Sequence, residues 1–351
     1  GVSWYPVLGT GDYPWHTSAA SSTGGVMWAG AEGSGGAKSG LWISTNGGAS
    51  FREVNATAAN LPANAVWSSV TVSADATTVV ATASDGSVWT STDGGVTFSS
   101  TSAPPANHAW SSVSSSGNAS FLLAAEQGGS CWVSLNGGQT WVEQTGPGDA
   151  PSPADWVATA VAADGTSGWA ADAGGNLWTY DVASDTWSAA STAGRQPWTS
   201  LAVSADGSVI FAGTESGELF YSKDGGATWV QDTSIVAAAG AQPITGIALA
   251  ADGRSAVVAT PSAGVFTWLD GNSGGKTSAP TSAPVTDLGQ VPGTAALGNF
   301  TSIAGDASNT NLVATVDNGK VRACVPVCVH ECVSVCLCAA VLRPTPTYPP
   351  T

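Results

Sequence analysis

The sequence predicts an all-β protein made of repeated antiparallel units, and its composition supports this fold class. The 351 residues include 44 Gly and 16 Trp but only one Met, and 10% are charged, against roughly 25% in an ordinary globular protein. Gly, Ser and Thr are abundant where a helical protein would carry Lys, Glu and Leu, so long helices are not expected. With 43% apolar residues, the chain can still bury a large core.

Each repeat unit follows one order of strands and turns. A first strand of alternating character leads into a turn such as Asp206-Gly207, and a second, apolar strand ends in a Gly-containing turn. A third strand ending in Trp or Phe then precedes a Gly-Gly turn and a short fourth strand. Four short strands in roughly 40 to 45 residues are typical of a propeller blade. Because one blade cannot bury both of its faces, neighbouring blades must stack around an axis.

The two ends of the chain predict how the ring closes. Residues 1–4 resemble residues 226–229, so the chain begins with a fourth strand, whereas residues 300–321 supply three strands and lack a fourth. We therefore predict a seven-bladed β-propeller of four-stranded antiparallel blades, in which residues 1–8 complete the last blade. The first strands are expected to begin near Trp15, Trp67, Trp110, Trp156, Trp198, Ile244 and Phe300.

A turn with a Gly-Gly pair recurs four times between the third and fourth strands. An Asp or Asn caps its own backbone there, Gly adopts a positive φ, and an aromatic ring packs the turn against the blade. These turns resemble the Asp-box, or BNR repeat, of sialidase-like β-propellers, and the resemblance covers roughly residues 1–322. The residues expected to hold the turns are Ser44, Asn46, Phe51, Ser91, Asp93, Phe98, Ser134, Asn136, Trp141, Ser222, Asp224 and Trp229.

The repeat is also similar in style to photosystem II assembly factor-like and xyloglucanase-like propellers. The first resemblance implies a single binding propeller, and the second implies two carboxylates across a cleft. Sialidase activity is disfavoured, because sialidase-type sites resemble one another in three arginines that clamp a carboxylate. Of the five arginines in this chain, only Arg195 is expected in a loop on the side where such a site would lie.

One face of the predicted ring, here the near face, carries the links between blades and the turns after the second strands. The turns after the second strands carry acidic residues, which are expected to form a ring on this face. Such a ring either binds a cation, a basic partner or sugar hydroxyls, or is a solvated rim that keeps the protein soluble. Five tryptophans are expected on the same face, at the beginning of the first strands. They either stack on sugars or pack between blades. The expected binding rim consists of Glu32, Asp85, Glu126, Asp172, Glu215, Asp317, Trp15, Trp67, Trp110, Trp156 and Trp198.

These features predict a non-catalytic binding or scaffold module that holds a protein or a carbohydrate on the near face, without a cofactor or a metal. The alternative is a glycoside hydrolase, with candidate carboxylates Asp12, Asp155, Asp172 and Glu215. A net charge of −16 with nine Lys and Arg argues against binding of nucleic acid or an anionic membrane. We expect a monomer that is secreted or lies in an organelle lumen.

The last part of the chain differs in composition, and we expect a separate tail over residues 323–351. Five of the six cysteines lie there, but their spacing fits no usual zinc site. Pro326 and His330 interrupt an apolar run that is too short for a membrane anchor. The tail is expected to be disordered or to come from an error in the gene model. Cys131, the sixth cysteine, is expected to be a buried apolar residue.

Overall fold

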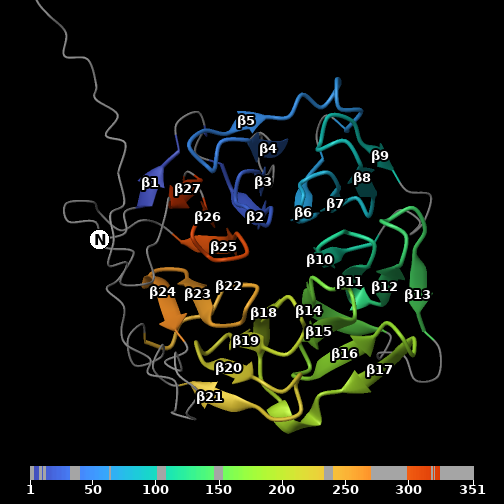
Figure 1. Ribbon diagram of the computed structural model, residues 1–351, viewed down its shortest axis with the longest axis vertical. Coiled ribbons are helices and arrows are strands. Elements are labelled where there is room, and N and C mark those ends of the chain that lie inside the picture. Colours follow the sequence, from blue (N-terminus) through green and yellow to red (C-terminus); the bar gives the residue numbers. More distant parts are fainter. Residues whose placement is uncertain are drawn as a thin grey trace, which may run out of the picture.

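The strands form antiparallel sheets arranged like blades around a central axis, so the chain is a β-propeller (Figure 1). This computed structural model describes residues 4–7, 10, 13–31, 40–62, 65–100, 108–145, 153–232, 240–269, 299–317, 319 and 321–324. The only helix in these ranges is the short 3₁₀ element η1 (Ser191–Ala193), and the all-β prediction is therefore confirmed. A helix with the length and apolar character needed to cross a bilayer does not occur in this part of the chain.

The first two sheets each contain four strands that pair in chain order. The first consists of β2 (Trp15–Ala20), β3 (Met27–Ala31), β4 (Gly40–Ser44) and β5 (Arg52–Glu53). The second consists of β6 (Trp67–Val72), β7 (Val79–Ala83), β8 (Val88–Ser91) and β9 (Ser99–Ser100). Every residue of β3 and of β7 is buried. Because apolar and β-branched side chains fit a pleated surface covered on both sides, these runs become second strands between neighbouring blades.

The next eight strands form one continuous sheet, because two blades share a short ladder. The strands are β10 (Trp110–Ser115), β11 (Leu122–Gly129), β12 (Cys131–Ser134), β13 (Val142–Gln144), β14 (Ala154–Val161), β15 (Ser167–Asp172), β16 (Leu177–Asp181) and β17 (Thr186–Ala189). Strand β11 is eight residues long and continues beyond its own blade. It pairs there with β14, with Gln127 opposite Asp155 and Gly129 opposite Ala154.

Two further sheets follow along the chain. One consists of β18 (Trp198–Val203), β19 (Ile210–Thr214), β20 (Leu219–Ser222) and β21 (Val230–Asp232). The other consists of β22 (Gly246–Leu249), β23 (Ser255–Thr260) and β24 (Gly264–Leu269). The fourth strand predicted for this second sheet would fall within residues 270–298, which lie outside the described residues.

The last sheet joins the two ends of the described chain, in the order β1 (Trp4–Pro6), β27 (Arg322–Cys324), β26 (Leu312–Val316) and β25 (Phe300–Gly305). Trp4 lies opposite Cys324 and Pro6 lies opposite Arg322, so the predicted closure by the N-terminal strand is confirmed. The third strand begins at Arg322, later than the sequence indicated, and it includes two residues that we had expected in the tail.

Hydroxyl side chains connect neighbouring innermost strands. The backbone N–H of Val70 donates to Thr17 Oγ1 at 3.2 Å, and that of Val113 donates to Ser69 Oγ at 3.1 Å. The next contact of this series joins β14 to β10, where Thr159 N–H donates to Ser112 Oγ at 3.1 Å. The innermost strands of different blades are too far apart for a common ladder, so Ser and Thr at these positions satisfy backbone donors that would otherwise be buried without a partner.

A closed cycle of backbone hydrogen bonds joins the turns between first and second strands. Each turn donates an N–H to a carbonyl oxygen of the next turn, at distances of 2.7 to 3.1 Å. The cycle passes through Ser22, Ala74, Gly117, Ala163 with Asp164, Ala205, Ala251 and Ala307, and it returns to Ser22. Since every turn bonds to the next one around the ring, the cycle holds the blades in a closed circle. It lies on the side opposite the near face, which we call the far face.

In two of the four Gly-Gly turns, a glycine allows a tryptophan of the preceding blade to contact the turn backbone. Gly95 has a φ of +84°, and a Cβ added to it would overlap the ring of Trp28. Gly226 has a φ of +87° and stands in the same relation to Trp169. Both rings are buried, with 0% and 2% of their surface exposed. A residue other than glycine would meet both backbone strain and a steric clash here.

We predict that Gly95→Ala destabilises the propeller by more than about 2 kcal/mol, because it adds overpacking against Trp28 to the cost of a positive φ. The matched control is Gly194→Ala, where φ is +70° but no atom lies within 4 Å of the added Cβ. That control should cost only about 1 kcal/mol. Denaturant unfolding of both variants measures the difference, and equal losses would show that Trp28 packing does not constrain the turn.

Candidate functional site on the near face

The near face is formed by the beginnings of the innermost strands and by the turns after the second strands. These segments share one face because the strands are antiparallel, with Trp156 opposite Asp172 and Trp198 opposite Thr214. The register shifts directly after the aromatic residue that begins the pairing with the second strand in six blades. These residues are Trp15, Trp67, Trp110, Trp156, Trp198 and Phe300. Such a bulge changes the direction of a side chain at the rim of a sheet.

The five tryptophans of the predicted rim are buried, with 0 to 4% of their surface exposed. Three of them donate an indole N–H to a turn of the preceding blade. Trp15 donates to the carbonyl oxygen of Gly319, Trp110 to that of Gly86 and Trp198 to that of Gly175, each at 2.9 Å. These rings connect blades, and burial leaves no ring face for a sugar to stack on. The geometry fits the packing interpretation of these residues.

The acidic residues of the predicted rim differ in their environment. Asp85 is exposed and accepts the backbone N–H of Ser87 at 2.9 Å, so it caps its own turn. Asp172 is 3% exposed, and its carboxylate accepts bonds from the backbone and side-chain amide of Asn176 and from the indole of Trp178. Asp317 is half-buried. Glu32 lies outside the described residues.

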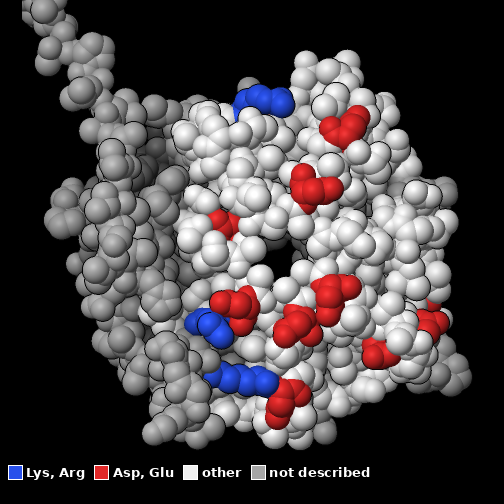
Figure 2. All heavy atoms as spheres, viewed as in Figure 1, with Lys and Arg blue, Asp and Glu red and all other residues white. Residues whose placement is uncertain are grey.

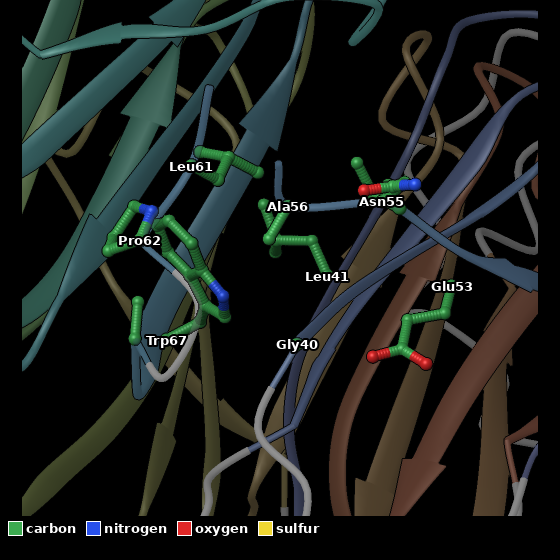
Figure 3. A pocket seen from close by; sticks show the side chains of 10 residues that line it. Gly40, Leu41, Glu53, Asn55, Ala56, Leu61, Pro62 and Trp67 are labelled. Carbon is green, nitrogen blue, oxygen red and sulfur yellow. The ribbon is translucent and has the colours of Figure 1, made fainter. Parts of the chain in front are cut away.

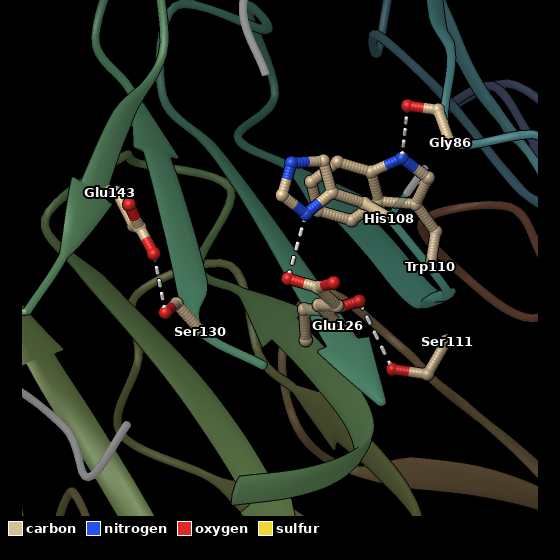
Figure 4. Close-up of polar contacts among 8 residues, drawn as sticks. Gly86, His108, Trp110, Ser111, Glu126, Ser130 and Glu143 are labelled. Carbon is tan, nitrogen blue, oxygen red and sulfur yellow. Dashed lines mark hydrogen bonds and ion pairs between the residues drawn. The ribbon is translucent and has the colours of Figure 1, made fainter. Parts of the chain in front are cut away.

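Glu126 contacts His108 on this face (Figure 4). Its carboxylate lies 2.8 Å from Nδ1 of His108, and both side chains are largely buried, with 15% and 17% exposed. The imidazole also packs on the ring of Trp110, at 5.2 Å between centroids, and against Trp132 at 5.3 Å. The nearby Ser130 hydroxyl donates to Glu143 at 2.7 Å. The Glu126–His108 pair therefore holds the link that precedes β10 against strand β11.

The carboxylates proposed for a hydrolase do not form an isolated pair in the described part of the chain. Asp155 and Glu215 are exposed, and Asp12 lies outside the described residues. The carboxylate of Asp172 is occupied by four hydrogen bonds within its own turn. A general acid needs a shielded carboxyl group directed at the substrate, and Asp172 is shielded but directed at its turn.

The arginines of the described ranges do not form a cluster that could clamp a carboxylate. Arg195 is exposed on the near face, where its Nε donates to Asn176 Oδ1 at 3.2 Å. Arg52 and Arg254 lie elsewhere, on β5 and in the turn between β22 and β23. Among the residues that the structure describes, no group of three or more His, Cys, Asp or Glu side chains is arranged to hold a metal ion. Burial raises the pKa of the Cys131 thiol, which is 1% exposed.

A central channel of about 360 Å³ runs between the innermost strands. Three consecutive residues of each of β2, β6, β10, β14, β18 and β25 line it, together with Thr245 and the first two residues of β22, and most of these residues are Ser or Thr. On the face drawn in Figure 2, acidic side chains gather around the central opening. The far-face turns between first and second strands contribute exposed aspartates, namely Asp75, Asp164, Asp206 and Asp252. Sequence analysis did not predict that these turns encircle the opening.

A groove of about 360 Å³ opens beside Trp67, between the first and second sheets (Figure 3). We call it the Trp67 groove. Sequence analysis missed it, because its walls come from the irregular link between β5 and β6 rather than from the repeat. Its lining consists of Gly40, Leu41, Glu53, Val54, Asn55, Ala56, Leu61, Pro62, Ala65 and Trp67. Most of the lining residues are apolar, but Leu41 and Trp67 are buried, each with 2% of its surface exposed, and the open surface of the groove is mainly polar. Glu53 and Asn55 lie at one side.

The four Gly-Gly turns on the far face share one set of hydrogen bonds. In the second sheet, Ser91 Oγ accepts the N–H of Gly95 at 2.9 Å, and Asp93 accepts the N–H of Thr97 at 2.9 Å and its hydroxyl at 2.6 Å. The predicted residues Ser44, Asn46, Ser134, Asn136, Ser222 and Asp224 make the corresponding backbone contacts. Phe51, Phe98 and Trp141 are buried, and Trp229 is half-buried.

These bonds also stabilise the ionised aspartates. The hydroxyl and backbone N–H of Thr97 lower the pKa of Asp93 to about 2, from an ordinary value of 3.8. Hydrogen bonds from Thr228 lower the pKa of Asp224 in the same way. Both carboxylates are charged acceptors at neutral pH, and they serve the turn rather than a ligand.

Comparison with solved structures identifies proteins of similar shape. One is YCF48 bound to D1 peptide, with a TM-score of 0.66 and 12% identity over 94% of this chain and 96% of that chain. This chain is similar in fold to YCF48. The photosystem II assembly factor YCF48 from Cyanidioschyzon merolae gives a TM-score of 0.64 and 17% identity over 92% of this chain and 98% of that chain. Identity at this level shows the propeller fold alone. Neither a family model nor a curated protein matches the sequence.

We predict that the double variant Asp93→Asn with Asp224→Asn loses part of the protein's acid sensitivity. A lowered pKa stabilises the folded state above the ordinary value of 3.8, and this stability is lost as the pH falls toward about 2. The unfolding temperature of the unmodified protein should therefore fall more steeply across this window. Asn46 and Asn136 occupy the same turn position, so the variant should fold. Identical slopes for the two proteins would contradict the prediction.

Proposed function

We propose that this chain is a non-catalytic binding propeller that holds a segment of a partner protein on its near face. The Trp67 groove is the observation that carries the proposal, since it is a hollow of about 360 Å³ built from the link between two blades. Concave sites of this kind are where proteins usually take in a bound group. The groove also lies in a link between blades, where propellers can vary without disturbing the repeat.

The fold comparison supports a protein rather than a carbohydrate as the partner. One similar structure is YCF48 with a bound peptide, and by analogy we propose that this chain binds a protein segment and acts in holding or assembling its partner. The buried tryptophans offer no exposed platform for sugar rings. A glycoside hydrolase finds less support, because the shielded carboxylate of Asp172 is directed at its own turn.

The proposal includes a ring of seven blades that extends to residue 324, two residues further than the sequence predicted, followed by a separate tail. Support comes from the closed cycle of backbone hydrogen bonds, which links equivalent turns without a gap. We also assign the four Gly-Gly turns to the Asp-box type, supported by their shared Ser and Asp or Asn acceptors. In this assignment the Asp-box residues serve the scaffold, and the links on the near face carry recognition.

We expect Ala56→Trp to fill the groove and to weaken partner binding at least about tenfold, as is typical when a central contact region is blocked. The probe is a phage library that displays random peptides, selected on the immobilised full chain and measured by surface binding. Leu135→Trp is the matched control, because it adds the same side chain to an exposed far-face turn. Failure to select any peptide, or equal binding by both variants, would count against the proposed function.

A further inference from the structure

The innermost strands share one backbone N–H position that faces the central channel. In β6 this N–H belongs to Val70, which points it away from β7 and donates it to Thr17 Oγ1 of the preceding blade. The residue before it, Ser69, accepts the N–H of Val113 from the next blade in the same way. Because the first and second strands pair in the same register throughout, each innermost strand has an equivalent N–H. These groups belong to Ser18, Val70, Val113, Thr159, Leu201, Ile247 and Ile303.

Hydroxyl groups accept these N–H groups on one side of the channel. The donors on β6, β10 and β14 are accepted at 3.1 to 3.2 Å by Ser or Thr of the preceding blade. The residues that would accept the N–H groups of Leu201 and Ile303 are Ala158 and Gly246, which carry no hydroxyl. A Cβ added to Gly246 would lie 3.0 Å from the backbone nitrogen of Ile303. A side chain at this position would therefore face the N–H, as the hydroxyls do elsewhere.

Two serines occupy the remaining accepting positions, and neither accepts a backbone N–H. Ser302 Oγ shares a hydrogen bond with Ser18 Oγ at 2.9 Å. Ser200 is 7% exposed, and its hydroxyl has no partner within the described ranges. Four neighbouring strands, β18, β22, β25 and β2, thus present an N–H that no described side chain accepts. We call this set the channel arc, and it consists of the N–H groups of Ser18, Leu201, Ile247 and Ile303.

Charge determines which ligands suit these donors. An anion would match N–H groups, but the net charge of −16 and the acidic side chains around the central opening (Figure 2) repel it. A cation would meet N–H groups of the same sign, and the described channel lining contains no Asp or Glu to offset them. An apolar ligand would leave the backbone donors and the Ser200 hydroxyl without partners. A neutral molecule rich in hydroxyl groups suits the arc, because each hydroxyl both accepts and donates a hydrogen bond.

The channel has room for such a molecule. Its volume of about 360 Å³ falls within the range of roughly 300 to 1,000 Å³ that is usual for ligand pockets. Water fills a polar channel when no ligand is bound. One polyol replaces several ordered waters and reproduces their hydrogen bonds, so the freedom that these waters regain favours the polyol.

We propose that the central channel binds one small neutral polyol against the channel arc. Its oxygens accept the N–H groups of Leu201, Ile247 and Ile303, and one of its hydroxyls bonds to Ser200. The opposite wall contributes less, because its N–H groups already have acceptors. This site is separate from the Trp67 groove and goes beyond the proposed function.

An NMR titration of the full chain, isotope-labelled at the amides of Leu, Ile and Val, tests the proposal. The probes are sorbitol, gluconate and glucamine, which share a six-carbon skeleton and differ in charge. We expect sorbitol to bind best, with a Kd of about 1 to 10 mM, and to shift the N–H signals of Leu201, Ile247 and Ile303. The signals of Val70 and Val113 should stay unchanged, because hydroxyls already accept these N–H groups.

Two variants of the arc should weaken sorbitol binding, each by about threefold to tenfold. Ser200→Ala removes the unpartnered hydroxyl, and Ala158→Ser supplies a hydroxyl that takes the N–H of Leu201 away from the ligand. Ser68→Ala is the matched control, because Ser68 also lines the channel but bonds to Thr82 within its own blade. Binding by the control should stay within about twofold of the unmodified protein.

The contrary results are equally specific. If sorbitol shifts none of the arc signals at concentrations up to about 100 mM, the channel holds water only and the proposal fails. Tighter binding of gluconate or glucamine would show that charge decides, and would overturn the assignment to a neutral polyol. Equal losses in Ser200→Ala and Ser68→Ala would overturn the assignment to the arc. The proposed function is tested separately, by peptide selection at the Trp67 groove.

Discussion

Packing of each blade against the next is the constraint on which the rest of this structure depends. A sheet whose second strand is wholly buried, such as β7, has two faces that must be covered. The chain covers them with a large aromatic residue at the beginning of most innermost strands and, at two of the four Gly-Gly turns, with a tryptophan of the preceding blade. Because the last blade needs the same cover, the ring must close, and β1 completes the final sheet beside β27.

This constraint determines which residues remain for recognition. Trp15, Trp110 and Trp198 use both their rings and their indole N–H groups between blades. The Ser and Thr residues of the innermost strands similarly accept bonds from neighbouring backbones, so much of the channel lining serves the scaffold. What is left on the near face comes from the links between blades, and the groove between β5 and β6 is built from such a link.

The acidic residues fall into two physical classes. Those of the far-face turns accept hydrogen bonds from neighbouring Ser and Thr, which explains the lowered pKa values of Asp75, Asp93 and Asp206. Several near-face acids instead stand in exposed positions around the links. The first class stabilises turns through local bonds, and the second contributes to a field that acts on whatever approaches this face. The negative net charge of the chain therefore comes from two separate groups of acidic residues, one in the far-face turns and one on the near face.

The sequence alone was sufficient to predict the all-β propeller, the beginnings of the innermost strands and the closing role of residues 4–6. These follow from local chemistry that repeats, such as turn residues, strand alternation and Gly-Gly pairs. It could not predict that β11 continues into the next blade, nor that Asp172 is enclosed by Asn176 and Trp178. The sequence also did not predict the Trp67 groove, because the link that forms it does not follow the repeat. Only the tertiary structure brings Leu41, Glu53 and Trp67 to the lining of one groove, since these residues meet through the packing of two blades.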